Sequence, residues 1–201
     1  EYINGDNFKL SIQADYYFGV PLDSGTVSYS ATAQDYYFDK YQDEYFDFSG
    51  GWYDCYSCGY GDEYLFRGEV EINENGRAEI ERKINFADYF ENKDDESSKL
   101  ITFFITAKDT SGRSVSMQKT FIVHKGEFYL GAKTDKYYTA VNTPINLKLK
   151  TVNTEGEAVA VSGIQKNIYK VEWETFKRQE VDGGFYYRSE KKLIEVKGEV
   201  V

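Results

Sequence analysis

Short runs in which apolar and polar residues alternate recur along the whole chain. Phe8, Leu10 and Ile12 alternate with polar neighbours, and Ile101 and Phe103 begin a similar run. Further runs lie at residues 27–31, 70–80, 115–123, 128–130, 145–149, 169–173 and 185–196, with turn residues between them. A period of two is that of a strand with one buried face, and no helical period persists beyond two turns. The sequence therefore predicts an all-β fold of antiparallel β-sandwiches.

The turn residues predict how some of these runs are joined. Asn75-Gly76 lies between two alternating runs and predicts a β-hairpin, because both central residues of that turn type need a positive φ. The residues of 109–112 (DTSG) predict a second hairpin, between residues 101–107 and 115–123. Further turns are predicted at 155–156 and 182–184, and residues 86–90 (FADYF) predict one helical turn.

The length of 201 residues fits two sandwiches in tandem, since one such domain has about 100 residues. The alternating pattern restarts at residues 124–127, which predicts domains of the immunoglobulin or fibronectin-III type at 1–125 and 126–201. The second is short for a complete sandwich, and a missing strand would leave an exposed sheet edge. The chain begins with a polar stretch and no initiator Met. We therefore expect a segment of a longer protein.

The net charge of −10 disfavours binding to nucleic acid and to anionic membrane surfaces, because both are negatively charged. No apolar run reaches the roughly 20 residues that cross a bilayer. These totals predict a chain whose partners are proteins, chiefly other domains of its own parent, with no membrane contact by this segment.

Residues 35–64 form an insertion with twelve aromatic residues, eight carboxylates and a single Lys40. Three functions are conceivable: a partner-contact patch, a Ca²⁺ site and a sugar-stacking surface. The structural alternative is a long decorated hairpin whose rings pack on the sheet while the acids stay in water. No spaced Asp-x-Asp-x-Asp-Gly loop supports calcium specifically. The candidate contact residues are Tyr41, Tyr45, Phe46, Trp52 and Tyr53.

Cys55 and Cys58 form a Cys-x-x-Cys among glycines, which favours a loop over the helix start of a redox enzyme. A small local disulfide is the preferred interpretation, with free thiols or a metal or redox role as alternatives. Zinc needs about four ligands, and the sole histidine, His124, is distant in sequence. A disulfide would fit an extracytoplasmic compartment.

No motif for catalysis stands out in the sequence. It contains no Gly-x-Ser-x-Gly elbow, no glycine-rich phosphate loop and no His-Glu-x-x-His. His124, at the predicted domain junction, is interpreted as a solvated linker residue, although a pH-sensitive role is the alternative. The sequence therefore predicts a protein that is not an enzyme and that has no cofactor, no metal and no catalytic residue.

Several segments together resemble macroglobulin-like domains of the bacterial alpha-2-macroglobulin family. The matching segments are 14–22 (ADYYFGVPL), 25–30 (GTVSYS), 107–115 (AKDTSGRSV), 123–125, 128–131 (FYLG), 135–137 and 168–173 (IYKVEW). Their order and spacing carry the resemblance, which covers most of the chain apart from the insertion.

The resemblance implies a role in a large, broad-spectrum peptidase inhibitor, periplasmic or membrane-anchored in bacteria. In such proteins a peptidase cuts a bait segment, and the resulting change of shape traps the peptidase. Many members also carry a thioester in a Cys-x-Glu-Gln motif, which neither Cys55 nor Cys58 begins. We therefore expect a scaffold segment of the cage wall that meets peptidases only through the whole parent.

Two other functions remain open. One is an immunoglobulin-like adhesin or surface-layer module, which would predict many near-identical repeats and an anchoring signal in the parent. The other is a carbohydrate-binding accessory domain of a secreted hydrolase, which would predict that oligosaccharides change the fluorescence of Trp52.

Overall fold

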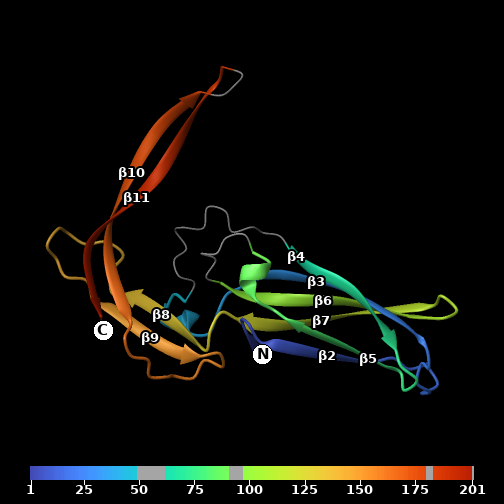
Figure 1. Cartoon of the computed structure of the whole chain (residues 1–201). Helices are drawn as coiled ribbons and strands as arrows, with labels where there is room; N and C mark the ends of the chain where they lie inside the picture. Colours follow the sequence, from blue (N-terminus) through green and yellow to red (C-terminus); the bar gives the residue numbers. More distant parts are fainter. Residues whose placement is uncertain (49–61, 91–96, 180–182, 201) are drawn as a thin grey trace. The chain divides into compact units, whose positions relative to one another are not determined.

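The chain is an all-β protein, which confirms the predicted fold class (Figure 1). The computed structural model describes residues 1–48, 62–90, 97–179 and 183–200. Its helical pieces in these residues are two 3₁₀ turns, η1 (Gln42–Glu44) and η2 (Phe86–Asp88), and η2 confirms the predicted helical turn. Contacts divide the chain into two units, residues 1–159 and 160–201, which are described separately.

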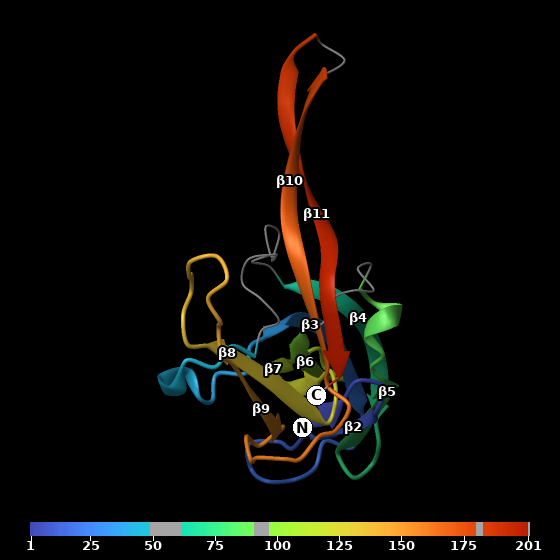
Figure 2. The same ribbon diagram turned by 90° about the vertical axis from the view of Figure 1, so that its left-hand side faces the viewer.

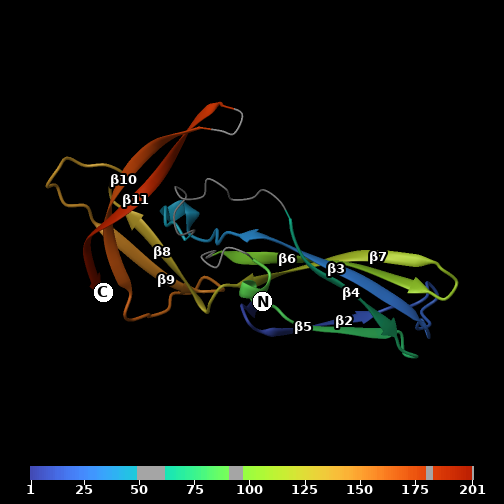
Figure 3. The same cartoon turned by 45° about the horizontal axis from the view of Figure 1, so that its top comes forward.

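The first unit contains a β-sandwich of two layers, which lie one above the other in Figure 3. One layer is a five-stranded sheet in the order β1-β7-β6-β3-β4, and the other is the antiparallel pair β2-β5. The strands are β1 (Tyr2–Ile3), β2 (Asn7–Gln13), β3 (Gly25–Tyr36), β4 (Glu63–Ile72), β5 (Arg77–Lys83), β6 (Ser98–Asp109) and β7 (Ser114–His124). Only the β1-β7 pair of the large sheet is parallel.

The sandwich core is aromatic at its centre. Phe103 of β6 is fully buried, and its ring centroid lies 5.3 Å from that of Phe8 on β2, 5.7 Å from Phe66 and 5.8 Å from Phe121. These edge-on and stacked rings join the two layers and bury much apolar area per residue. Inward-facing aliphatic residues complete the core, among them Ile12, Val27, Ala31, Ile80, Ile101 and Ile105.

The turn at Asn75-Gly76 is present, but the hairpin predicted around it is wrong. The turn is closed by the amide of Asn73, which donates to the carbonyl of Arg77 over 2.9 Å, and Gly76 has a φ of 76°. The strands on either side nevertheless pair elsewhere, β4 with β3 and β5 with β2. The turn is thus a corner between the two layers, because alternation specifies which face a strand buries and not which strand it pairs with.

The second predicted hairpin, β6-β7, is confirmed, with Lys108 opposite Ser114. Its turn is organised by the carboxylate of Asp109, which accepts hydrogen bonds from the amides of Ser111 and Arg113, both 2.9 Å long. The hydroxyl of Ser111 and the guanidinium of Arg113 also donate to this carboxylate, and together these groups lower the pKa of Asp109 to about 2.

The first unit continues beyond the sandwich into the antiparallel sheet β8 (Phe128–Thr134) and β9 (Leu147–Asn153). Compactness therefore groups residues 126–159 with the preceding sandwich. The domain boundary near residue 125 stays a prediction, because two sandwiches joined by a tight interface would give the same grouping.

The second unit is a long antiparallel hairpin of β10 (Gln165–Gln179) and β11 (Phe185–Val200), seen as a twisted ribbon in Figure 2. Its strands are about three times the usual strand length of 5–6 residues. β10 confirms the strand predicted around residues 169–173, and a register shift after Ile168 marks a bulge near its start.

Candidate partner-contact site

The first described part of the aromatic insertion, residues 35–48, continues from the end of β3 and lies against the β8-β9 sheet. A bridge fixes it there: the amides of Asp47 and Ala132 each donate to the carbonyl of the other over 2.9 Å. Phe38 and Phe48 pack on this sheet, whereas Tyr37 and Tyr45 are exposed, so the structural alternative describes only some of the rings. The supporting sheet belongs to the residues that follow the predicted domain boundary.

Stacked rings hold the insertion on β8. The ring of Phe38 lies 4.5 Å from that of Tyr129 in a stacked arrangement and 5.0 Å from that of Phe48. The ring of Phe48 covers Gly131, where an added Cβ would lie 2.5 Å from it. Glycine is therefore required at position 131 for the insertion to approach the strand this closely.

Two lysines clamp the insertion at its 3₁₀ turn η1. The ammonium of Lys150 on β9 lies 2.9 Å from the carboxylate of Glu44 and 3.7 Å from the ring centroid of Tyr41. The ammonium of Lys133 on β8 donates to the carbonyl of Glu44 over 2.7 Å and lies 4.4 Å from the ring of Phe46. Each cation thus combines a charge-assisted hydrogen bond with a cation–π contact.

The predicted contact residues have different environments. Tyr41 and Phe46 are half-buried under the lysine clamp, and the hydroxyl of Tyr41 donates to the carbonyl of Gly156 over 2.5 Å. Tyr45 is 84 % exposed and has a φ of 60°. Trp52 and Tyr53 lie outside the described residues, as do Cys55 and Cys58. The contact patch and the disulfide therefore stay predictions.

A chain of hydrogen bonds joins the sandwich to β8 at the predicted junction. The hydroxyl of Tyr129 lies 2.6 Å from Nδ1 of His124 and 2.8 Å from Oγ of Ser98, which accepts from the amide of Lys125 over 3.0 Å. Nε2 of His124 faces the carboxylate of Glu1 at 3.5 Å. Nε2 has no hydrogen-bond partner among the described residues, so Glu1 acts on His124 through its charge. With the proton of the neutral ring on Nε2, Nδ1 accepts from Tyr129, and Tyr129 accepts from Ser98.

The interpretation of His124 as a solvated linker residue is wrong. It is 1 % exposed, and burial lowers its pKa below the ordinary histidine value, an effect that the charge of Glu1 opposes. Burial likewise raises the pKa of Tyr129 to about 12, so the phenol remains a donor. The position of a lone histidine next to a lysine gave no signal of this burial. The alternation of β7 places Val123 in the core and so predicts that its neighbour His124 faces outward. It therefore does not show that His124 is buried as well.

A buried ion pair supports the base of the insertion. Lys99 of β6 is 3 % exposed, and its ammonium lies 2.6 Å from the carboxylate of Asp35 at the end of β3. The same carboxylate accepts from the hydroxyl of Ser97 over 2.7 Å, and the ring of Phe90 lies 4.4 Å from the ammonium. A buried charge needs such partners, so the pair fixes where the insertion leaves the sheet.

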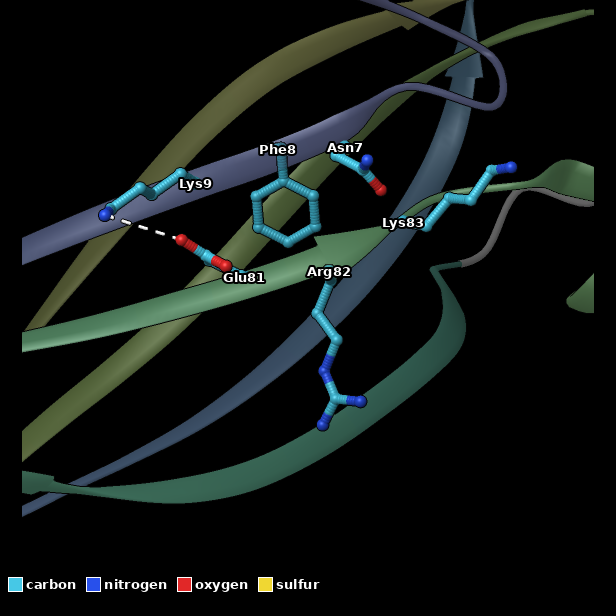
Figure 4. A pocket seen from close by; sticks show the side chains of 6 residues that line it. All are labelled: Asn7, Phe8, Lys9, Glu81, Arg82 and Lys83. Carbon is cyan, nitrogen blue, oxygen red and sulfur yellow. Dashed lines mark ion pairs between the residues drawn. The ribbon is translucent and has the colours of Figure 1, made fainter.

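A hollow of about 400 Å³ lies over the β2-β5 pair (Figure 4). Its lining residues are Asn7, Phe8, Lys9, Glu81, Arg82 and Lys83. The ammonium of Lys9 lies 2.7 Å from Glu79 and 3.4 Å from Glu81, contacts that raise the pKa of Lys9. Arg82 extends to the other side of the strand and donates to the hydroxyl of Tyr29 over 3.2 Å. Lys9 and Arg82 thus make ion pairs and hydrogen bonds to other residues of the sandwich. The lining of the hollow therefore gives no indication of a catalytic or ligand-binding site.

The polar side chains at the junction are engaged in buried packing contacts. The described residues include no group of three His, Cys, Asp or Glu side chains placed to hold a metal ion. Ser98 and His124 share Tyr129, but both are almost completely buried, so a substrate has no access to the serine hydroxyl. In the same part of the chain, no helix has the length and apolar character needed to cross a bilayer. Of the eight carboxylates of the insertion, only Asp54 lies outside the described part, and the other seven belong to no such metal-binding group.

Known proteins resemble this chain in structure and not in sequence. No family model matches the chain, and no curated protein matches it. Its structure is similar to Escherichia coli alpha-2-macroglobulin in the native conformation, with a TM-score of 0.60 and 13 % identity, and after activation by porcine elastase, with 0.62 and 15 %. A Salmonella alpha-2-macroglobulin mutant gives 0.60 and 13 %.

The whole of this chain is covered in each of these comparisons, whereas it spans only 13–17 % of the length of the other chains. The chain thus has the all-β fold of a segment of bacterial alpha-2-macroglobulins. At such identities the likeness concerns the fold and does not extend to functional residues.

Proposed function

We propose that the chain is a scaffold segment of a bacterial alpha-2-macroglobulin-like peptidase inhibitor, acting outside the cytoplasm. The observation that carries this proposal is the likeness over the complete chain to alpha-2-macroglobulin in both the native and the elastase-activated conformation. A likeness confined to the sandwich would suit any immunoglobulin-like module. Here it includes the β8-β9 sheet and the long hairpin as well.

The contacts of the first unit support a structural role. The insertion, the β8-β9 sheet and the sandwich are joined by the Tyr129 hydrogen bonds, the ring stack of Phe38 and the clamp of Lys150. Such contacts make a stiff connection between successive sheets, which a wall segment needs. The sequence contains no Cys-x-Glu-Gln, so the proposed role of this segment includes no thioester.

The test uses the parent polypeptide and the 201-residue chain side by side. The parent, incubated with porcine elastase, should suppress cleavage of a large protein substrate more than cleavage of a small chromogenic peptide, because a surrounding wall would exclude the large substrate first. The 201-residue chain should leave both activities unchanged. Inhibition by this chain alone would contradict a pure scaffold role. A parent made of near-identical repeats with an anchoring signal would favour the adhesin alternative.

A further inference from the structure

The sandwich contains two Asn-Gly pairs, Asn4-Gly5 between β1 and β2 and Asn75-Gly76 between β4 and β5. Glycine has no Cβ, so the backbone nitrogen that follows such an asparagine is sterically open. This nitrogen can attack the side-chain amide of the asparagine, and spontaneous deamidation is therefore fastest when glycine follows. The hydrogen bonds around each pair decide whether the reaction proceeds in the folded chain.

Asn4 has both its side chain and its backbone fixed by hydrogen bonds. Its Oδ1 accepts from the amide of Phe86 over 2.8 Å, and its own amide donates to the carbonyl of His124 over 2.7 Å. The nitrogen that would attack, that of Gly5, donates to the carbonyl of Ile84 over 2.7 Å. The reaction requires the side chain and the backbone to rotate and break these bonds together. The fold thus protects Asn4.

Asn75 has a side chain that is free to rotate. Among the described residues its carboxamide has no hydrogen-bond partner, because only its backbone groups are engaged, by Oδ1 of Asn73 over 3.0 Å and by Nε2 of Gln13 over 3.1 Å. The attacking nitrogen, that of Gly76, is held by a single turn hydrogen bond of 2.9 Å to the carbonyl of Asn73. Local opening of a turn costs less free energy than opening of paired core strands.

The fold requires the glycine that makes Asn75 reactive. Gly76 has a φ of 76°, and an added Cβ would lie 2.6 Å from the carbonyl oxygen of Ala14 and 3.1 Å from Pro21. Any other residue would be strained and overpacked at this corner between the two layers. The asparagine is different, because its carboxamide makes no contact that another side chain would have to replace.

We propose that Asn75 is a site of spontaneous deamidation in the folded chain, whereas Asn4 is protected. The nitrogen of Gly76 loses its proton and attacks Cγ of Asn75, and the bond from Cγ to Nδ2 breaks as ammonia leaves with that proton. Water then opens the cyclic succinimide. Opening at Cγ leaves an aspartate, and opening at the backbone carbonyl leaves an isoaspartate, in which the chain runs through the former side chain. This inference does not depend on the proposed function.

The modification should loosen the corner. An isoaspartate lengthens the backbone by a methylene group between the two layers, where the turn bond from Gly76 to Asn73 must then change. The carbonyl of Gly76 also accepts from the amide of Ala14 over 2.8 Å, which joins the corner to the loop after β2. The new carboxylate follows Glu74 directly in a chain whose net charge is already −10. We therefore expect the modified chain to have a lower thermal midpoint.

The two Asn-Gly pairs are controls for each other. The folded 201-residue chain should be incubated at mildly alkaline pH and body temperature, and the peptides that contain Asn4 and Asn75 should be compared by mass spectrometry over time. Asn75 should convert several-fold faster than Asn4, with isoaspartate as the main product. In the chain unfolded in urea the two rates should become similar, because the hydrogen bonds that distinguish the pairs are gone.

Conversion of Asn4 as fast as that of Asn75 in the folded chain would overturn the proposal, and so would an Asn75 that stays intact. The variant Asn75→Gln gives a second readout, since glutamine must close a larger ring and reacts far more slowly. Its thermal midpoint should stay constant during the incubation, whereas that of the unsubstituted chain should fall as isoaspartate accumulates. An equal fall in both chains would contradict the role of Asn75.

Discussion

The phenol of Tyr129 lies with its oxygen 2.6 Å from Nδ1 of His124, although the two residues belong to different sheets and are separated by the turn that links them. The same oxygen lies 2.8 Å from Oγ of Ser98, which in turn accepts from the amide of Lys125. These contacts fix the start of β8 against the start of β6 and the end of β7. The junction between the sheets is therefore a hydrogen-bonded connection with a defined geometry.

Removing the phenol oxygen should weaken this junction. Tyr129→Phe keeps the ring that stacks on Phe38 but leaves Ser98 and His124 without their shared partner in a buried place. We expect a loss of about 1–3 kcal/mol in the free energy of unfolding, the usual cost of an unsatisfied buried polar group. Urea denaturation of the 201-residue chain measures it. Tyr137→Phe is the matched control, because Tyr137 is 93 % exposed, and a similar loss there would show that the effect is not due to the junction.

The stability of the chain should fall as the pH drops below about 6.5, the ordinary histidine value. Because burial lowers the pKa of His124 in the folded state, the unfolded state takes up a proton first. The stabilising contribution of the neutral ring is complete above the unfolded pKa and is lost as the pH falls toward the folded one. Thermal midpoints measured between pH 8 and pH 5.5 should show this decline.

His124 is the sole histidine, which makes the assignment simple. In His124→Phe, the decline of the thermal midpoint between pH 7 and pH 5.5 should be much smaller than in the unsubstituted 201-residue chain, although the variant is less stable at pH 8. An unchanged decline would assign it to the carboxylates instead and show that His124 titrates normally.

Alternation along the chain was sufficient to predict the fold class, most strands and the β6-β7 hairpin. The buried residues Ile101, Phe103 and Ile105 lie where the period of two puts them. The same pattern failed to predict the partners of β4 and β5. A sheet corner and a hairpin can use the same Asn-Gly turn, and only the packing of the two layers distinguishes them.

The candidate site was partly predictable. The unusual composition of residues 35–64 marked the insertion, but composition does not reveal which of its aromatic side chains pack against other strands and which stay exposed. Tyr41 and Phe46 contact lysines of β8 and β9 that are about a hundred residues away, and no local pattern encodes such a pairing. Buried Lys99 and His124 were unpredictable for a related reason, because a polar residue is buried only when distant partners satisfy it.

The close approach of the insertion to β8 should depend on the absence of a side chain at Gly131. In Gly131→Ala, the new Cβ would lie 2.5 Å from the ring of Phe48, so either the ring or the strand must move. We expect a destabilisation of about 1–3 kcal/mol, as for other overpacked sites, measured by urea denaturation. Gly126→Ala is the matched control, since an added Cβ there meets no atom within 4 Å.

Shortening the opposing ring should restore the fit. Phe48→Leu combined with Gly131→Ala should be more stable than the sum of the two single losses predicts, because the smaller side chain leaves room for the Cβ. Strict additivity would show that Phe48 and Gly131 do not meet.

The contacts of Lys150 should contribute little to the free energy of unfolding. A double-mutant cycle should nevertheless show a coupling energy between Lys150 and each of its partners. Lys150 is 25 % exposed, and its ammonium contacts both the carboxylate of Glu44 and the ring of Tyr41. Lys150→Met keeps most of the aliphatic length and removes the charge, and we expect a loss of about 0.5–1 kcal/mol. Lys148→Met, on the same face of β9 but exposed, should change stability by less than about 0.5 kcal/mol.

A double-mutant cycle separates the two contacts of Lys150. With Glu44→Gln the coupling should shrink in 1 M salt, because salt screens an exposed ion pair. With Tyr41→Leu the coupling should persist in salt, because the ring lies directly against the ammonium and water is excluded between them. If neither cycle shows a coupling energy above about 0.3 kcal/mol, the limit for independent sites, then Lys150 does not hold the insertion. Its attachment would then rest on the other contacts, such as the ring stack of Phe38 and the Asp47–Ala132 bridge.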